Sequence, residues 1–224
     1  MEKHKGEMVI LFLVTSAING DPVRLEETYE TLESIHKRVP IASICLLETS
    51  IQPQLIEYPR VNVVPFWDQD WIKEIHAKDR DVAFLKSAIE MRVTIGILKR
   101  VPTLYTHIFK VSGRYVLTDD FDLNNHPANK ATFAEARQTG FSMEQVGTDG
   151  MLMTRLYSMC STVVPQVVEA LEKAERFHHK QWDEGRIFDI EHGLWKFLPR
   201  DILNQIGKIG VKGRIGHLQH IVED

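Results

Sequence analysis

The sequence predicts a single α/β domain of the Rossmann-like kind, with a mostly parallel central sheet and helices on both faces. Three observations lead to this class. Almost uninterrupted apolar runs at residues 9–14 and 41–47 are typical of strands that are covered on both faces. Longer amphipathic segments at residues 22–38 and 82–98 alternate with these runs. Strands and helices in alternation favour a parallel sheet with helices on each side.

The size and composition agree with one domain over residues 1–224. A chain of 224 residues with 43% apolar side chains can bury one large core. Its net charge of −4 gives no general attraction for a polyanion, so we do not expect nucleic acid as a partner. No apolar run is long enough to cross a bilayer, so no transmembrane segment is expected.

The first apolar run, residues 9–14, could be part of a secretion signal or the first strand of the sheet. A small-residue cleavage site is missing, and Glu2 and Glu7 interrupt the basic flank that a signal needs. A buried strand is therefore the better interpretation. Cys45 and Cys160 lie in apolar stretches, which indicates buried thiols rather than a disulfide framework. Together these features predict a reducing, cytoplasmic location.

The remaining elements follow in chain order. Residues 22–38 form a helix, because Leu25, Leu32 and Ile35 recur at helical spacing. Pro165 near the start of residues 163–179 is typical of a first helical turn. The other expected segments are strands at 61–64, 107–111, 115–117 and 151–157, helices at 82–98 and 189–198, a loop with one helical turn at 124–138, and a looping, glycine-spaced tail at 206–216.

An acidic turn, residues 119–122, directly follows the apolar strand at 115–117. In extended backbone, residues two apart point the same way, so Asp120 and Asp122 could both reach one ion. Carboxylates are preferred ligands of Mg²⁺ or Mn²⁺, and ligands of open α/β sheets lie beyond the carboxyl ends of the strands, where we expect this turn. A solvated turn or a set of helix caps would give the same pattern, and the residues alone leave both interpretations open.

A longer stretch around this turn resembles a known family. Residues 109–122 resemble the Lys-x-Ser/Thr-Gly-Arg-Tyr strand and acidic turn of small GT-A-like glycosyltransferases of bacteria and large DNA viruses, chloroviruses included. Further stretches fit the same family in the same order, so the resemblance spans about residues 8–216. They are residues 14–18, 24–35, 45–48, 86–90 and 154–158.

The resemblance implies a GT-A fold with a nucleotide-binding half at about 8–123 and an acceptor-side half at about 124–224. It implies transfer of a sugar from a nucleotide-sugar donor, a UDP-sugar first of all, to a saccharide or glycan acceptor. A Mn²⁺ or Mg²⁺ ion would bridge the donor's diphosphate. The metal ligands so implied are Asp120, Asp122 and His217. The nucleotide or substrate contacts are Thr15, Arg24, Glu48, Lys86, Ser112, Arg114 and Asp120.

Two of these assignments compete with simpler roles. Glu48 could instead be an ordinary exposed loop acid. Lys86 could form a helical surface ion pair with Glu90, four residues further on.

A second acidic cluster supplies the candidate catalytic groups. By the resemblance, Glu191 would meet the acceptor hydroxyl, with Asp189 as the second choice. Acids in a first helical turn also simply favour the helix dipole.

Other function classes remain open at this stage. A non-catalytic nucleotide- or carbohydrate-binding protein would need no second acidic cluster. An aspartate-dependent phosphatase would place its acid pair early in the chain, whereas Asp120 and Asp122 lie mid-chain. A sugar nucleotidyltransferase would need a glycine-rich loop after the first strand, and residues 15–20 are not one. The donor sugar, the acceptor and the stereochemistry of transfer are not encoded in any of these motifs.

Overall fold

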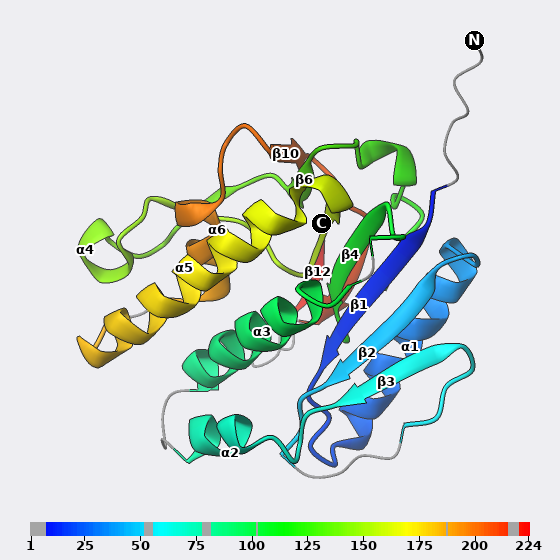
Figure 1. The fold of residues 1–224 in the computed structure, drawn as a ribbon, viewed down its shortest axis with the longest axis horizontal. Helices are drawn as coiled ribbons and strands as arrows, with labels where there is room; N and C mark the ends of the chain where they lie inside the picture. The colour runs from blue at the N-terminus through cyan, green and yellow to red at the C-terminus, as the bar shows by residue number, and fades with distance from the viewer. Residues whose placement is uncertain (1–7, 52–55, 78–81, 102, 187, 215–219) are drawn as a thin grey trace.

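A computed structural model describes residues 8–51, 56–77, 82–101, 103–186, 188–214 and 220–224. Its centre is a seven-stranded sheet (Figure 1). The strands are β1 (Ile10–Ser16), β2 (Ser43–Glu48), β3 (Val61–Pro65), β4 (His107–Ser112), β6 (Ala131–Ala134), β9 (Leu156–Cys160) and β10 (Leu203–Ile206), in the order β10-β6-β9-β4-β1-β2-β3. β3, β2, β1 and β4 run parallel, and β9 is antiparallel to both β4 and β6. The sheet is thus mixed but mostly parallel, and the predicted α/β class is confirmed.

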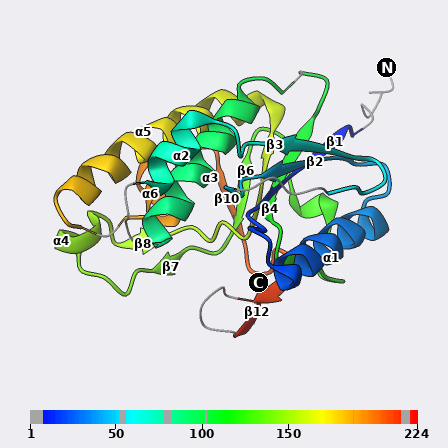
Figure 2. The same cartoon turned by 90° about the horizontal axis from the view of Figure 1, so that it is seen from below.

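Helices cover both faces of the sheet (Figure 2). They are α1 (Pro22–Arg38), α2 (Asp70–His76), α3 (Val82–Leu98), α4 (Met143–Val146), α5 (Val164–Asp183) and α6 (Ile190–Phe197). Successive side chains of β1 point to opposite faces of the sheet. Phe12 therefore packs in the core on the α1 side, and Leu13 packs in the core with α3 and α5. In the described part of the chain, none of the helices has the length and apolar character that a membrane span requires.

A smaller antiparallel sheet lies on the α1 side. It contains β5 (Tyr115–Leu117), β11 (Val211–Arg214) and β12 (Ile221–Glu223), in the order β12-β11-β5. A side chain at Gly213 would place its Cβ 2.1 Å from the Arg114 carbonyl oxygen, so the close approach of β11 to β5 requires glycine there. The short elements are β7 (Arg137–Gln138), β8 (Gly150–Met151) and two 3₁₀ turns, Leu123–Asn125 and Ser161–Val163.

The sequence placed the first half of the chain better than the second. The helices at 22–38 and 82–98 are confirmed, but the predicted loop at 124–138 contains β6, an interior strand of the sheet. All four β6 residues are buried, and a run this short shows no period. The strand predicted at 151–157 begins only at Leu156, and the tail predicted to loop at 206–216 starts on the last residue of β10 and contains β11. Both halves of the chain therefore build one sheet.

Candidate ligand cavity

A cavity of about 320 Å³ lies at the carboxyl ends of β1 and β4. The chain adds β2 and β3 on one side of β1 and then returns to place β4 on the other side, so strand order reverses between β1 and β4. Ligands of open α/β sheets bind at such a switch point. Thr15 and Ser112 lie opposite each other in the β1–β4 pairing, and both line the cavity. The loop after β1, the start of α1 and one face of α3 also line the cavity, together with residues after β2, on α2 and after β4.

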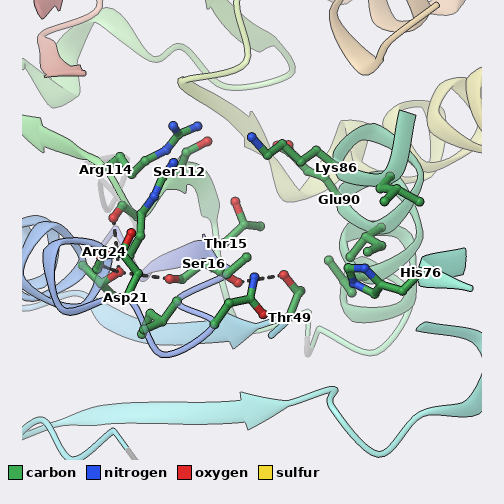
Figure 3. Close-up of a pocket in the computed structure, with 18 residues that line it drawn as sticks. Thr15, Ser16, Asp21, Arg24, Thr49, His76, Lys86, Glu90, Ser112 and Arg114 are labelled. Carbon is green, nitrogen blue, oxygen red and sulfur yellow. Dashed lines mark hydrogen bonds between the residues drawn. The ribbon is translucent and has the colours of Figure 1, made fainter. Parts of the chain in front are cut away.

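Three cationic side chains, which we call the basic cluster, line this cavity: Arg24 on α1, Lys86 on α3 and Arg114 between β4 and β5. Figure 3 shows Arg114 and Lys86 reaching toward one another from opposite sides. Burial lowers the pKa of Lys86, and the charges of Arg114 and Arg24 lower it further. Burial and then Arg24 also lower the pKa of Arg114. The three cations therefore repel one another, and an anion between them would relieve this repulsion.

The basic cluster lacks strong partners within the described part of the chain. Arg24 has one carboxylate nearby, Glu27, at 3.7 Å. Neither Lys86 nor Arg114 takes part in an ion pair with a described residue. Nη1 of Arg114 is buried and has no hydrogen-bond partner there. Because buried donors are almost always satisfied, this donor is available to an oxygen acceptor beside Arg114.

The other end of the cavity is polar but uncharged. Thr49, which follows β2, and His76 on α2 lie there, away from the basic cluster (Figure 3). Burial lowers the pKa of His76, which favours the neutral imidazole. Its Nε2 atom is buried and has no hydrogen-bond partner among the described residues. The cavity thus suits an elongated ligand with an anionic end and a neutral, hydrogen-bonding end.

Glu48 does not line the cavity but joins two of the loops that do. Its side chain is fully buried, and Oε1 accepts hydrogen bonds from the amide of Ile18 at 3.1 Å and the amide of Ser50 at 3.0 Å. The Ser50 hydroxyl also donates to it. The amide of Asn19 in turn donates to Ser50 Oγ at 2.8 Å. This carboxylate therefore holds the loop after β1 against the loop after β2.

The acidic turn lies elsewhere. From Gly113, β5 runs back along α1: the Thr28 hydroxyl donates to the Gly113 carbonyl, the Leu117 amide donates to Ser34 Oγ, and Arg38 pairs with Asp119. A helix rises about 1.5 Å per residue, so roughly 20 Å of α1 separates Arg24 at the cavity from Arg38 at the acidic turn. The turn is not beyond the carboxyl ends of the parallel strands, because β5 reverses the chain.

The carboxylates of the acidic turn are already engaged. Asp120 pairs with Lys208 at 3.1 Å. Asp122 accepts hydrogen bonds from the amide and the side chain of Asn124, both at 2.9 Å, as the cap of a 3₁₀ turn. No three His, Cys, Asp or Glu side chains gather as a metal site among the residues that the structure describes, and His217 lies outside them. The acidic turn therefore does not fit a metal that bridges a diphosphate in the cavity.

The second acidic cluster splits into two different settings. Asp189 caps α6 and accepts from the amide of His192 at 3.0 Å and its Nδ1 at 2.8 Å. Burial acts to raise the pKa of Asp189, but these hydrogen bonds outweigh it and hold the pKa below its usual value. Glu191 is half-buried and faces Thr154, whose amide and hydroxyl donate to it at 3.3 and 3.4 Å. Neither carboxylate lines the cavity.

Two residues, Glu90 and Lys110, were not predicted from the sequence to act at the site. Glu90 lines the cavity and pairs with Lys110 of β4 rather than with Lys86. Lys110 is a charge inside an otherwise apolar strand, with an exposed fraction of 0%. A buried charge must be paired, so a lysine in the middle of a buried strand was the signal that could have indicated a partner at this site.

These features define an α/β protein with a cavity lined by three cations at the switch point of its sheet. No protein-family model matches the sequence, and a search of curated proteins finds no match either.

Proposed function

We propose that this protein is a GT-A-type glycosyltransferase that takes its sugar from a nucleoside diphosphate donor and passes it to a saccharide acceptor. A UDP-sugar is the donor to test first. The resemblance of residues 109–122 to such enzymes suggested this activity, and the cavity is compatible with it. The diphosphate would lie at the basic cluster and the nucleoside toward Thr49 and His76.

One observation carries the proposal: three cations converge on a switch-point cavity, and the buried Nη1 of Arg114 has no partner among the described residues. When the bond between sugar and phosphate breaks, negative charge builds on the departing diphosphate. Positioned cations stabilise that charge most where water is excluded. Arg114 offers a guanidinium with several donors, and Lys86 a mobile ammonium that can follow the leaving oxygens.

A divalent ion would supply a Lewis acid for the same leaving group. In this fold, Asp120 and Asp122 are turned away from the cavity by β5, so we assign the charge compensation to the basic cluster and route no step through these carboxylates. The phosphatase alternative loses support for the same reason, because it depended on Asp120 and Asp122 acting at the ligand. A non-catalytic nucleotide-binding protein would share the cavity and differ only in turnover.

The proposal is tested with calorimetry of UDP, GDP and dTDP binding, followed by donor turnover. Wild-type protein should bind one of these nucleotides with the same affinity in Mn²⁺ and in EDTA. Arg114→Gln should weaken that binding by roughly 10- to 100-fold, since a charge-assisted contact to phosphate is worth about 1.5–3 kcal/mol. Turnover is then followed as release of the nucleotide from a panel of UDP-, GDP- and dTDP-sugars, with water as the acceptor.

Arg38→Gln is the matched control, because Arg38 lies at the far end of α1 and pairs with Asp119. It should bind nucleotide as the wild type does. Absence of nucleotide binding by wild-type protein would refute the proposed function. Binding without turnover of any donor in the panel would support the non-catalytic alternative.

A further inference from the structure

Glu90 is placed differently from the other acid of the cavity. Among the described lining residues, the carboxylates are those of Asp21 and Glu90. Asp21 is occupied as the N-cap of α1, where it accepts from the Val23 amide at 2.9 Å. Glu90 caps nothing. It lies one helical turn after Lys86 on α3, so both side chains project from the same face of the helix into the cavity.

Lys110, on β4 of the central sheet, holds Glu90 in place. Its ammonium is fully buried and pairs with Oε1 of Glu90, whose own side chain is 20% exposed. The same ammonium donates to Ser112 Oγ at 3.1 Å and to the Thr154 carbonyl oxygen at 3.2 Å. All three of its donors are therefore used. Because its donors are all used, Lys110 fixes Oε1 of Glu90 in place. The exposed part of the Glu90 side chain then faces the cavity.

Glu191 is separated from Lys110 by Thr154 and lies outside the cavity lining. It contacts the amide and hydroxyl of Thr154, while the Thr154 carbonyl accepts from Lys110. Burial and the charge of Asp189 raise the pKa of Glu191 to about 7. A carboxyl that does not line the cavity cannot take a proton from a ligand within it without an intermediary.

We propose that Glu90 is the catalytic carboxylate that accepts the proton of the acceptor hydroxyl, and that Lys110 is its positioning residue. This inference rests on the proposed function. In a direct displacement, the acceptor oxygen forms a bond to the anomeric carbon of the donor and loses its proton to Glu90. The bond from that carbon to the phosphate oxygen breaks, and its electron pair leaves with the diphosphate toward Arg114 and Lys86.

The test compares nucleotide affinity with turnover in the full chain. The turnover probe is the donor sugar, from the panel above, that wild-type protein consumes fastest with water as the acceptor. Glu90→Gln keeps the shape and removes the base, so the affinity for the free nucleotide should stay within about threefold and turnover should fall by roughly 100-fold or more. Lys110→Met should lower kcat with little change in nucleotide affinity, and Lys110→Arg should restore part of the loss.

Glu172→Gln is the matched control, because Glu172 is an acid on α5 that pairs with Lys99 away from the cavity. It should turn over donor as the wild type does. If nucleotide binding and wild-type turnover are present but Glu90→Gln is fully active, the assignment of Glu90 is refuted while the proposed function stands. A 100-fold loss in Glu191→Gln without one in Glu90→Gln would also refute it. Absence of turnover in the wild type would refute both.

Should Lys110→Met fail to fold, Glu90→Gln still decides the catalytic role. The positioning role is then decided by Lys110→Gln, which keeps a hydrogen-bond donor but removes the charge that pairs with Glu90. It should lower kcat by several-fold with nucleotide affinity kept. Unchanged kcat in that variant would refute the positioning role.

Discussion

Arg114 of the basic cluster lies only a few residues before the acidic turn, and yet the two regions differ in charge, in direction and in their partners. The cations of the basic cluster converge on one cavity from three elements, and Lys86 and Arg114 have no ion-pair partner in the described structure. The carboxylates of the acidic turn project outward and are already paired, Asp119 with Arg38 and Asp120 with Lys208. The comparison teaches that like charges indicate a ligand site where they meet in a cavity and the described residues supply no counter-charge.

The largest expected effect separates the two regions directly. The double variant Lys86→Ala/Arg114→Gln should lose about 100-fold or more in nucleotide affinity, because about 3 kcal/mol or more of charge-assisted contact is removed. The double variant Asp120→Asn/Asp122→Asn should bind as the wild type does. Calorimetry with the nucleotide that wild-type protein prefers measures both. A larger loss of nucleotide affinity in the aspartate variant would contradict this assignment and place the phosphate-binding site at the acidic turn.

A second experiment asks whether Glu48 behaves as a structural link. Glu48→Ala leaves the amides of Ile18 and Ser50 without their acceptor, so unfolding by urea should show a loss of about 2–3 kcal/mol in stability. Nucleotide affinity should fall with it, because both loops line the cavity. Glu57→Ala, at an exposed acid, should stay within about 0.5 kcal/mol of the wild type. Lost affinity with unchanged stability would instead mean that Glu48 contacts the ligand.

The pH dependence of stability tests the setting of Glu191, which contacts Thr154 and does not line the cavity. Because the folded state raises the pKa of Glu191 to about 7 from 4.5, it holds the proton that the unfolded chain releases. The resulting stabilisation is complete below the unfolded pKa and is lost as pH rises to the folded one. Relative to Glu191→Gln, the wild type should therefore lose roughly 1–3 kcal/mol between about pH 4.5 and pH 7.5. A difference that does not vary with pH would mean that Glu191 is solvated.

The smallest effect is expected at the acidic turn itself. Asp122 caps a 3₁₀ turn, so Asp122→Ala should reduce the free energy of unfolding by about 1 kcal/mol or less. Thermal unfolding of the free protein measures this. The addition of Mn²⁺ should stabilise the variant and the wild type equally. Stabilisation by Mn²⁺ in the wild type alone would show that Asp122 holds a metal.

The sequence predicted most elements of the first half of the chain and named the three cations of the basic cluster, and it failed where the path of the chain mattered. Arg24, Lys86 and Arg114 each sit at a predictable strand end or helix face, so their meeting follows from the parallel order of β1 and β4. The return of β5 along α1 depends on its pairing with β11, which comes from a distant part of the chain. No local pattern around Asp120 encodes that pairing.

The pairing of β5 with β11 also determines when, during folding, the lining of the cavity can be completed. β1, β2, β3 and β4 are neighbours in sequence and can associate early, because closing their connections costs little chain entropy. The segment that begins at Arg114 is held by Val211 and Gly213, which are synthesised much later, near the end of the 224 residues. Long-range pairings of this kind form slowly. During synthesis, β1 to β4 can therefore associate well before the segment that carries Arg114 is fixed by β11.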